Sequence, residues 1–409
     1  MPESAPVFSP RESGYRWVIM ALAAASFTLA FVSRFAWPPL MTEIMPVMKI
    51  NRTEALAYMT AFYLGYVATQ IPGGLLADRF GPRLVLSCAL GLQGLGTLGL
   101  GLTENYQAGF LMRLVCGLGA GCVYSSCLKS IVTWFTPARR GLAIGVLYFS
   151  PPLGIALPNL VMPLLNEQLG WGGAFRALGL ILTGLALVLF GLMKEAGTAA
   201  AGPRRKFLGG LGLVLRNRNI LLIALSGFSV VWAQIGFGSA ANAHLVKTLG
   251  LTLPEAGRVM LAYGLAGFLT PALAGYLCVK FPSKKKALLI GGHLALAGAL
   301  LFFGGLREVT RVFLAAGLIG LLVSFLNPIS TIIIADNAAP EWAATAGGVG
   351  NAIFQVGAVL SPLAIGLAAD ARGDYGLTWA ILAAGALVGV FTTALVRNPK
   401  GEHKVRPGR

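Results

Sequence analysis

The feature that most constrains this chain is a series of long apolar runs separated by short polar breaks. A helix needs roughly 20 predominantly apolar residues to cross the hydrocarbon core of a bilayer. Twelve runs of suitable length can be counted, at residues 14–41, 54–77, 84–102, 108–135, 142–165, 174–193, 219–246, 258–279, 286–305, 311–335, 344–368 and 376–396. The sequence therefore predicts an all-α membrane protein with twelve transmembrane helices.

Composition separates this chain from soluble proteins. Apolar residues make up 56% and charged residues 11% of the 409 residues, whereas about 25% of the residues in a soluble domain are charged. The same figures exclude collagen-like, disordered and disulfide-scaffold classes. All five cysteines lie inside apolar runs, where cysteine packs as a small apolar residue, so we expect free thiols.

The distribution of positive charge predicts the orientation in the membrane. The chain has 32 Lys and Arg against 15 Asp and Glu, a net charge of +17. If the N-terminus is cytoplasmic, the loops on that side carry 21 of these cations and the opposite loops carry eight. This excess predicts that both termini are cytoplasmic in a bacterial-type inner membrane. It also explains the basic charge without a nucleic-acid partner, and leaves membrane lipid as the expected surroundings.

The longest polar break divides the chain into two halves of six runs each. It extends from Lys194 to Arg218 and contains Gly197, Gly202 and Pro203. We expect an N-terminal six-helix bundle at 1–193, a cytoplasmic linker at 194–218, a C-terminal six-helix bundle at 219–397 and a basic cytoplasmic tail at 398–409. Secondary transporters use two such repeats, although a channel is not excluded by this pattern alone.

A glycine-rich charged turn lies between the second and third runs and reads Gly74-Leu-Leu-Ala-Asp78-Arg79-Phe-Gly81-Pro-Arg83. Such a turn can hold helix ends together and release them when bundles rock. A degenerate copy, Gly275 to Lys286, occupies the matching place in the second half. With Arg113 and Gly117 in the fourth run, these motifs resemble the major facilitator superfamily, which implies two six-helix bundles and transport by alternating access.

A second resemblance is to the organic-anion branch of that family, the anion:cation symporters. Arg34 is followed at the spacing of that branch by Gln70-Ile71-Pro72-Gly73-Gly74, and Lys129 precedes Trp134-Phe135. The branch commonly has an aspartate before the first arginine and a glutamate in the fourth span. Here Ser33 takes the first position and the fourth run has no acid. Symport with a coupling proton and anion exchange therefore both remain open.

Cations inside apolar runs are the first candidates for a binding site, because an unpaired charge in a bilayer is costly. Arg34 and Lys129 have no evident buried carboxylate partner in the first half, which favours a water-filled cavity that receives a small anionic substrate. At 1.5 Å per residue, Arg34 lies roughly 10 Å outward and Lys129 roughly 10 Å inward of mid-span. Whether they share one site stays open, and each could instead extend to lipid headgroups.

Neutral polar residues in the spans complete the list of substrate-binding candidates: Tyr124, Gln234, Asn242, Tyr263, Asn327, Asn351 and Gln355. Each could instead hydrogen-bond across helices. We expect Arg113 to stabilise helix packing through backbone carbonyls, and the residues of the charged turn, Gly74, Asp78, Arg79, Gly81 and Arg83, to serve gating. His244 lies near the outer end of its run, which predicts a surface histidine.

These patterns favour a monomeric secondary transporter of a small organic anion, most simply a mono- or dicarboxylate. An exporter of amphipathic or drug-like compounds and a ligand sensor that does not transport are the alternatives. An enzyme is not expected, because no nucleophile and base occur in a recognisable pattern. No cofactor, metal site or catalytic residue is expected either, since the three histidines are far apart and no nucleotide motif occurs.

Overall fold

The computed structural model describes residues 14–195, 207–339, 342–372 and 375–397, and all regular structure in these ranges is helical. The first half contains α1 (Arg16–Phe35), α2 (Trp37–Met48), α3 (Arg52–Phe80), α4 (Pro82–Leu100), α5 (Tyr106–Trp134), α6 (Pro137–Leu147) and α7 (Ser150–Leu192). The second half contains α9 (Arg218–Leu249), α10 (Leu253–Ala266), α11 (Thr270–Lys280), a 3₁₀ turn at Pro282–Lys284, α12 (Lys285–Gly305), α13 (Val309–Asp336), α14 (Ala343–Arg372) and α15 (Gly376–Ala394).

The described helices confirm an all-α membrane protein. Ten segments are long and apolar enough to cross a bilayer. Helix α3 is not among them, although it has 29 residues, because charged and amide side chains occur along it. The fifth and sixth predicted runs form one segment, Leu142–Leu192, with a non-helical residue at Gly170. Among the described residues, length and composition therefore give ten candidate spanning segments, and the expected twelve helices are not confirmed.

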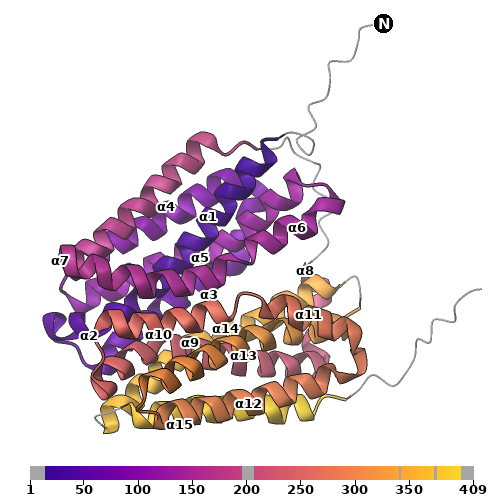
Figure 1. Ribbon diagram of the computed structural model, residues 1–409. Helices are drawn as coiled ribbons and strands as arrows, with labels where there is room; N and C mark the ends of the chain where they lie inside the picture. The colour runs from indigo at the N-terminus through magenta and orange to yellow at the C-terminus, as the bar shows by residue number, and fades with distance from the viewer. Residues whose placement is uncertain (1–13, 196–206, 340–341, 373–374, 398–409) are drawn as a thin grey trace, which may run out of the picture.

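The two halves of the chain form two helical bundles, which lie close together at one end and diverge toward the other (Figure 1). The start of α1 and the ends of α7 and α15 lie at the divergent end, called here the linker end. Of the expected linker, residues 196–206 lie outside the described residues, and the part from Phe207 to Arg216 is helix α8. The expected tail at 398–409 also lies outside the described residues.

Polar contacts join the bundles at the opposite end, called here the closed end. The carboxylate of Asp370, near the end of α14, accepts hydrogen bonds from the backbone N–H groups of Arg52 (3.2 Å) and Thr53 (2.8 Å) at the start of α3. The side-chain amide of Asn242 on α9 donates to Asn159 on α7 at 2.8 Å. The Asp370 contact connects two helix ends, whereas Asn242 and Asn159 meet within their helices.

Three glycines bring the backbones of the two bundles together, Gly257 and Gly366 toward the closed end and Gly264 nearer the centre. A Cβ added to Gly257 would lie 2.0 Å from the carbonyl oxygen of Asn159, and one added to Gly264 would lie 2.9 Å from Ala156. A Cβ on Gly366 would lie 2.9 Å from the Cα of Thr53. Small residues permit such close helix approach, so the closed end is packed backbone against backbone.

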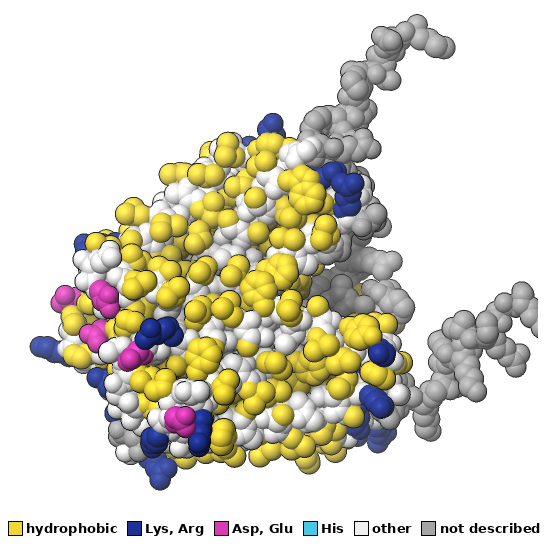
Figure 2. Space-filling view, viewed as in Figure 1, with side chains coloured by type: hydrophobic (Ala, Val, Ile, Leu, Met, Phe, Trp, Pro, Cys, Tyr) yellow, Lys and Arg dark blue, Asp and Glu magenta, His cyan; other side chains and the backbone are white. Residues whose placement is uncertain are grey.

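The molecular surface agrees with a position in a membrane. Hydrophobic side chains cover the middle of the visible face, and charged side chains gather at its two ends (Figure 2). On this face the acidic side chains lie at the closed end, whereas Lys and Arg occur at both ends. This pattern is expected for a protein with a hydrocarbon belt and two polar surfaces.

Candidate functional site

Arg34 lies near the middle of its membrane segment. Helices α1 and α2 form one 33-residue segment, Arg16–Met48, interrupted only at Ala36. With a rise of 1.5 Å per residue, Arg34 is about 3 Å from the midpoint of that segment. The expected offset of roughly 10 Å is wrong, because that estimate ended the span at residue 41. At this depth a reach to lipid headgroups is not favoured.

The joint between α1 and α2 is stabilised by Arg113 of α5. Pro38 and Pro39 have no N–H groups, so the helix cannot hydrogen-bond the carbonyls of Arg34 and Phe35 in the usual way. The guanidinium of Arg113 donates to the carbonyls of Ser33 and Arg34, both at 3.1 Å. Arg113 is almost completely buried. These contacts are the ones expected of an arginine that packs helices through backbone carbonyls.

The guanidinium of Arg34 is surrounded by aromatic rings. Its Cζ lies 4.2 Å from the ring centre of Phe31 and 4.5 Å from that of Tyr66, with Phe62 and Tyr63 at 5.5 and 5.6 Å. Cation–π attraction offsets part of the cost of burying the charge. Among the described residues Arg34 forms no ion pair, and its Nε is buried without a hydrogen-bond partner. The charge is therefore shielded from lipid but not neutralised.

Close packing of α3 against α5 fixes the position of these rings. A Cβ on Gly117 would lie 2.0 Å from the carbonyl oxygen of Phe62, and one on Gly121 would lie 2.4 Å from that of Tyr66. Gly65 approaches the Leu114 carbonyl in the same way. The pair Gly117 and Gly121 thus has the helix-packing role that small residues have in membrane proteins. Any larger residue at these positions would displace the aromatic face of α3.

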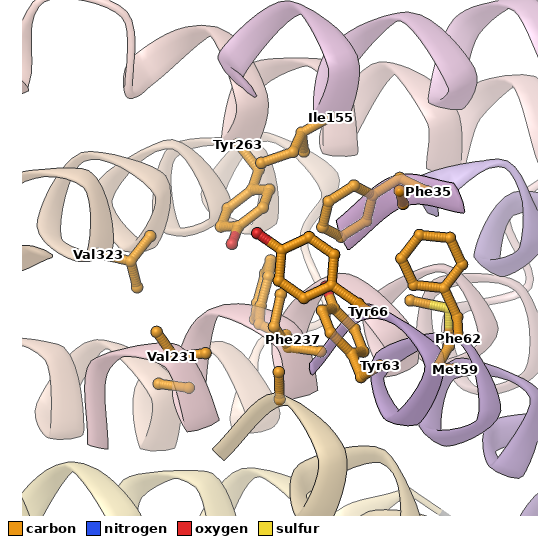
Figure 3. Close-up of a cluster of buried hydrophobic side chains, with 14 of the residues drawn as sticks. Phe35, Met59, Phe62, Tyr63, Tyr66, Ile155, Val231, Phe237, Tyr263 and Val323 are labelled. Carbon is orange, nitrogen blue, oxygen red and sulfur yellow. The ribbon is translucent and has the colours of Figure 1, made fainter. Parts of the chain in front are cut away.

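The aromatic face of α3 is the part of the site that sequence reasoning missed. Phe62, Tyr63 and Tyr66 lie within one turn, and Figure 3 shows Tyr63 and Tyr66 facing Phe237 and Tyr263 of the second bundle. Three aromatic residues at this spacing on one side of a helix were a signal that could have been found. Without the fold, however, nothing connected that side of α3 to Arg34.

Lys129 lies apart from Arg34. Its Nζ is 3.0 Å from a carboxylate oxygen of Asp78 and donates to the carbonyl of Ala77 at 2.7 Å. The sequence suggested no buried carboxylate partner for Lys129, and the partner that the charged turn at the end of α3 supplies is a largely exposed one. Lys129 is about 13 Å toward the linker end from the middle of α5 at 1.5 Å per residue. The structure does not bring the two cations together.

Polar groups of the second bundle meet near the centre of the molecule. Asn327 donates to the side-chain oxygen of Gln234 at 3.4 Å, and the Tyr263 hydroxyl donates to the Gln234 carbonyl at 3.2 Å. Gln234 and Tyr263 also line a cavity of about 40 Å³ between the bundles. That volume holds ordered water but not a sugar acid. These three residues thus face the interface between the bundles.

The remaining predicted residues lie at different places. Asn242 belongs to the closed end, where it bonds Asn159. Tyr124 on α5 shares a 3.0 Å hydrogen bond with the hydroxyl of Tyr148. Asn351 and Gln355 lie one turn apart on α14 and are partly exposed. Only a change of conformation could bring Asn242 into a central site, since it is buried in the contact between the bundles.

The charged turn at the linker end connects helices within the first bundle. Asp78 pairs with α5 through Lys129, and Arg83 donates to the Phe190 carbonyl at the end of α7 through Nε at 2.9 Å. Arg79 lies over the ring of its neighbour Phe80. Gly81 has φ +84° and separates α3 from α4. By contrast, Gly74 makes only ordinary contact with Ser125, since an added Cβ would lie 3.8 Å away.

The copy of this turn in the second bundle makes similar connections, with a lysine in place of the acid and with the ion pair formed by the start of α12 rather than the end of α11. Lys286 donates to the carbonyls of Ala394 and Val396 at the end of α15, both at 2.8 Å. Lys285 pairs with Asp336 at the end of α13. In the first bundle the acid lies on the turn, whereas in the second it lies on the long helix. The internal repeat expected from sequence is thus visible in the contacts.

His244 is not a surface residue. It is buried, with its ring centre 4.9 Å from that of Trp379 and 5.9 Å from that of Phe303. The expectation of exposure is wrong because α9 continues to Leu249, and its last turns pack within the second bundle. Among the residues that the structure describes, no three His, Cys, Asp or Glu side chains are grouped as metal ligands would be.

Comparisons with known proteins agree with the fold. Relatives that match most of the chain include the probable sulfoacetate transporter SauU of Cupriavidus necator, 24% identical over 93% of this chain and 94% of that protein. The hexuronate transporter of Bacillus subtilis is 23% identical over 86% of each chain. The probable L-galactonate transporter of Escherichia coli is 24% identical over 86% of this chain and 82% of that protein.

A solved structure has the same fold. It is a bacterial homologue of the human lysosomal transporter Spinster in an inward-facing, unoccupied conformation, which aligns with a TM-score of 0.77 and 16% identity over 94% of this chain and 95% of that one. A sequence model of the Major Facilitator Superfamily matches residues 17–362 and again residues 225–409. The chain is an integral, multi-pass membrane protein and not an enzyme. It belongs to the Major Facilitator Superfamily.

Proposed function

We propose that this protein is a secondary transporter of a small organic anion and that Arg34 is the principal ligand of the anionic group. The observation that carries the proposal is a buried cation near mid-segment that forms no ion pair in the described part of the chain. A charge at that depth costs about 2.5–3.5 kcal/mol on insertion scales. The aromatic rings offset part of this cost without consuming the charge, which leaves Arg34 available to an incoming anion.

The second bundle supports a substrate with hydroxyl or similar polar groups. It presents neutral amides and a phenol toward the interface, Gln234, Asn327 and Tyr263, and carries Asn351 and Gln355 on α14. Amides can both donate to and accept from hydroxyl groups. Relatives named for sulfoacetate, hexuronate and L-galactonate transport support acids of this kind.

The proposed topology has twelve membrane passes and cytoplasmic termini. Helix α3 would cross despite its polar residues, and the segment 142–192 would cross twice with its turn at Gly170. The linker end is then cytoplasmic, as the excess of Lys and Arg favours. In this orientation the bundles are closed on the outside and diverge toward the cytoplasm, which is one of the two states that alternating access requires.

For coupling, anion exchange is the simpler mechanism. The described acids, such as Asp78, Asp336 and Asp370, lie near helix ends rather than beside Arg34. An exchanger needs no protonatable group at the centre, because one anion replaces another on the same cation. Counterflow of a labelled acid in proteoliposomes without a pH gradient tests this choice. Uptake that depends strictly on a proton gradient would favour symport instead.

Thermal stabilisation of the purified protein by acids tests the anion site. The panel contains sulfoacetate, D-galacturonate, L-galactonate, galactarate and oxalate, with lipophilic cations as controls. A ligand that binds only the folded protein raises its stability by about 2.7 kcal/mol at 100 times Kd. We expect at least one acid to stabilise the wild type, Arg34→Gln to abolish that shift, and Lys129→Gln to retain it. Stabilisation by lipophilic cations alone would favour a drug-like exporter.

A further inference from the structure

Tyr63 carries a buried hydroxyl that the fold leaves unsatisfied. The side chain has no exposed surface, and its Oη has no hydrogen-bond partner among the described residues. A buried polar group without a partner costs stability. Tyr58, one turn and a half earlier on the same helix, shows the usual arrangement, because its hydroxyl donates to the Tyr106 carbonyl at 3.0 Å. Tyr63 therefore differs from Tyr58, a buried tyrosine of the same helix whose hydroxyl is satisfied.

The unsatisfied hydroxyl belongs to the surroundings of Arg34. The Tyr63 ring centre lies 5.6 Å from the Arg34 Cζ, and the Nε of Arg34 is itself buried without a partner. Both groups donate hydrogen bonds, and neither has an acceptor in the part of the chain that the structure describes. Two unsatisfied donors side by side form a place for one acceptor group that carries negative charge.

The position of Tyr63 also excludes a role in holding the bundles together by polar contacts. The described hydrogen bonds between the bundles come from Arg52, Thr53, Thr60 and Asn159 on the first bundle. Tyr63 instead faces Phe237, an apolar residue of α9, in the close-up (Figure 3). The ring supplies the packing between the bundles, and the hydroxyl interacts with the guanidinium of Arg34 in its own bundle.

We infer that Tyr63 is a substrate ligand, whose hydroxyl donates to the same carboxylate or sulfonate group that Arg34 binds through Nε. This inference rests on the proposed function, since it needs an anion at Arg34. The bound group would accept from a guanidinium and a phenol at once, as oxyanions commonly do. Because Arg34 is 6% exposed and Tyr63 is fully buried, the acid reaches them only when the surrounding rings of Phe31, Phe62 and Tyr66 move apart.

The test compares affinity with stability in two matched variants. Tyr63→Phe removes only the unsatisfied hydroxyl, and Tyr58→Phe removes a satisfied one from the same helix. Binding of sulfoacetate, D-galacturonate and galactarate is measured by isothermal titration calorimetry in nanodiscs, and the melting temperature is measured without ligand. We expect Tyr63→Phe to weaken binding by roughly ten- to a hundredfold while its unliganded melting temperature stays unchanged or rises. Tyr58→Phe should melt lower but bind like wild type.

The outcomes separate the two proposals. If Arg34→Gln loses binding while Tyr63→Phe binds like wild type, the inference is overturned and the anion site at Arg34 stands. If Tyr63→Phe melts lower and its affinity does not fall, the hydroxyl is structural and the inference is again overturned. If no acid binds wild type, or Arg34→Gln binds equally well, the proposed function fails and the inference fails with it.

Discussion

The contact of Asp370 with the start of α3 predicts how strongly the closed end is held. Asp370→Ala removes two hydrogen bonds from backbone N–H groups to a carboxylate, at 3.2 and 2.8 Å. Bonds to charged groups contribute about 1.5–3 kcal/mol each when well buried. Asp370 is only partly buried, so solvent screening reduces the sum to about 1–2 kcal/mol. Asp370→Asn keeps one acceptor oxygen and should lose about half as much.

This free energy corresponds to a population shift of roughly five- to thirtyfold toward a conformation opened at the closed end. Spin labels at Glu104 and Arg307, in loops of the two bundles at that end, report the distance between the bundles by double electron–electron resonance. Cys88 is exchanged for serine, since it is exposed. Asp370→Ala should populate a longer distance, whereas Asn159 and the glycine contacts keep part of the population closed.

Glu308 provides the matched control for that experiment. It is an exposed acid at the same end, and its ion pair with Arg311 at 2.7 Å stays within its own bundle. Glu308→Ala should leave the distance distribution unchanged. If Asp370→Ala gives the wild-type distribution, or if both variants shift it equally, the contact with α3 does not hold the closed end and the reasoning from helix-end hydrogen bonds is refuted.

Three further predictions concern other parts of the fold. Gly257→Ala places a methyl group 2.0 Å from the Asn159 carbonyl oxygen. The variant should lengthen the distance between the spin labels at Glu104 and Arg307 and slow counterflow of the acid. A wild-type rate of counterflow would contradict the proposed contact. Asp78→Asn and Lys129→Gln should each leave the affinity for the acid within about twofold of wild type, because the ion pair lies far from Arg34. The solvent-accessible pair contributes only about 0–1 kcal/mol to stability. A tenfold loss of affinity on calorimetry would place Lys129 in the site. Arg113→Met leaves two buried carbonyls unpaired and should lower the free energy of unfolding by about 2–4 kcal/mol. The melting temperature should fall accordingly. An unchanged melting temperature would disprove this role of Arg113.

Those parts of the fold that depend on local sequence could be predicted well. The apolar runs gave the membrane class, and the charged turn with its copy gave the repeat. The contacts of Arg113 with carbonyls followed from a general rule, because a lone arginine in a membrane helix must find acceptors. These predictions needed no knowledge of which helices are neighbours.

What the sequence could not supply was the partner of each polar side chain. Lys129 lies 51 positions from Asp78, and the pair exists only because α3 and α5 are neighbours. The depth of Arg34 was misjudged for a related reason. The first apolar run was ended at residue 41, but α2, which accepts Pro38 and Pro39 in its first turn, continues the segment to Met48.

The way in which Arg113 completes the joint between α1 and α2 has a mechanical consequence. Because Pro38 and Pro39 supply no N–H groups, bending the chain at Ala36 breaks no hydrogen bond within the helix at those two positions. Arg113 clamps the end of α1 to α5, and α2 packs against α9 of the second bundle. Helix α2 can therefore tilt about Ala36 while α1 stays fixed to α5, so that the closed end loosens before the bundles rotate as whole bodies.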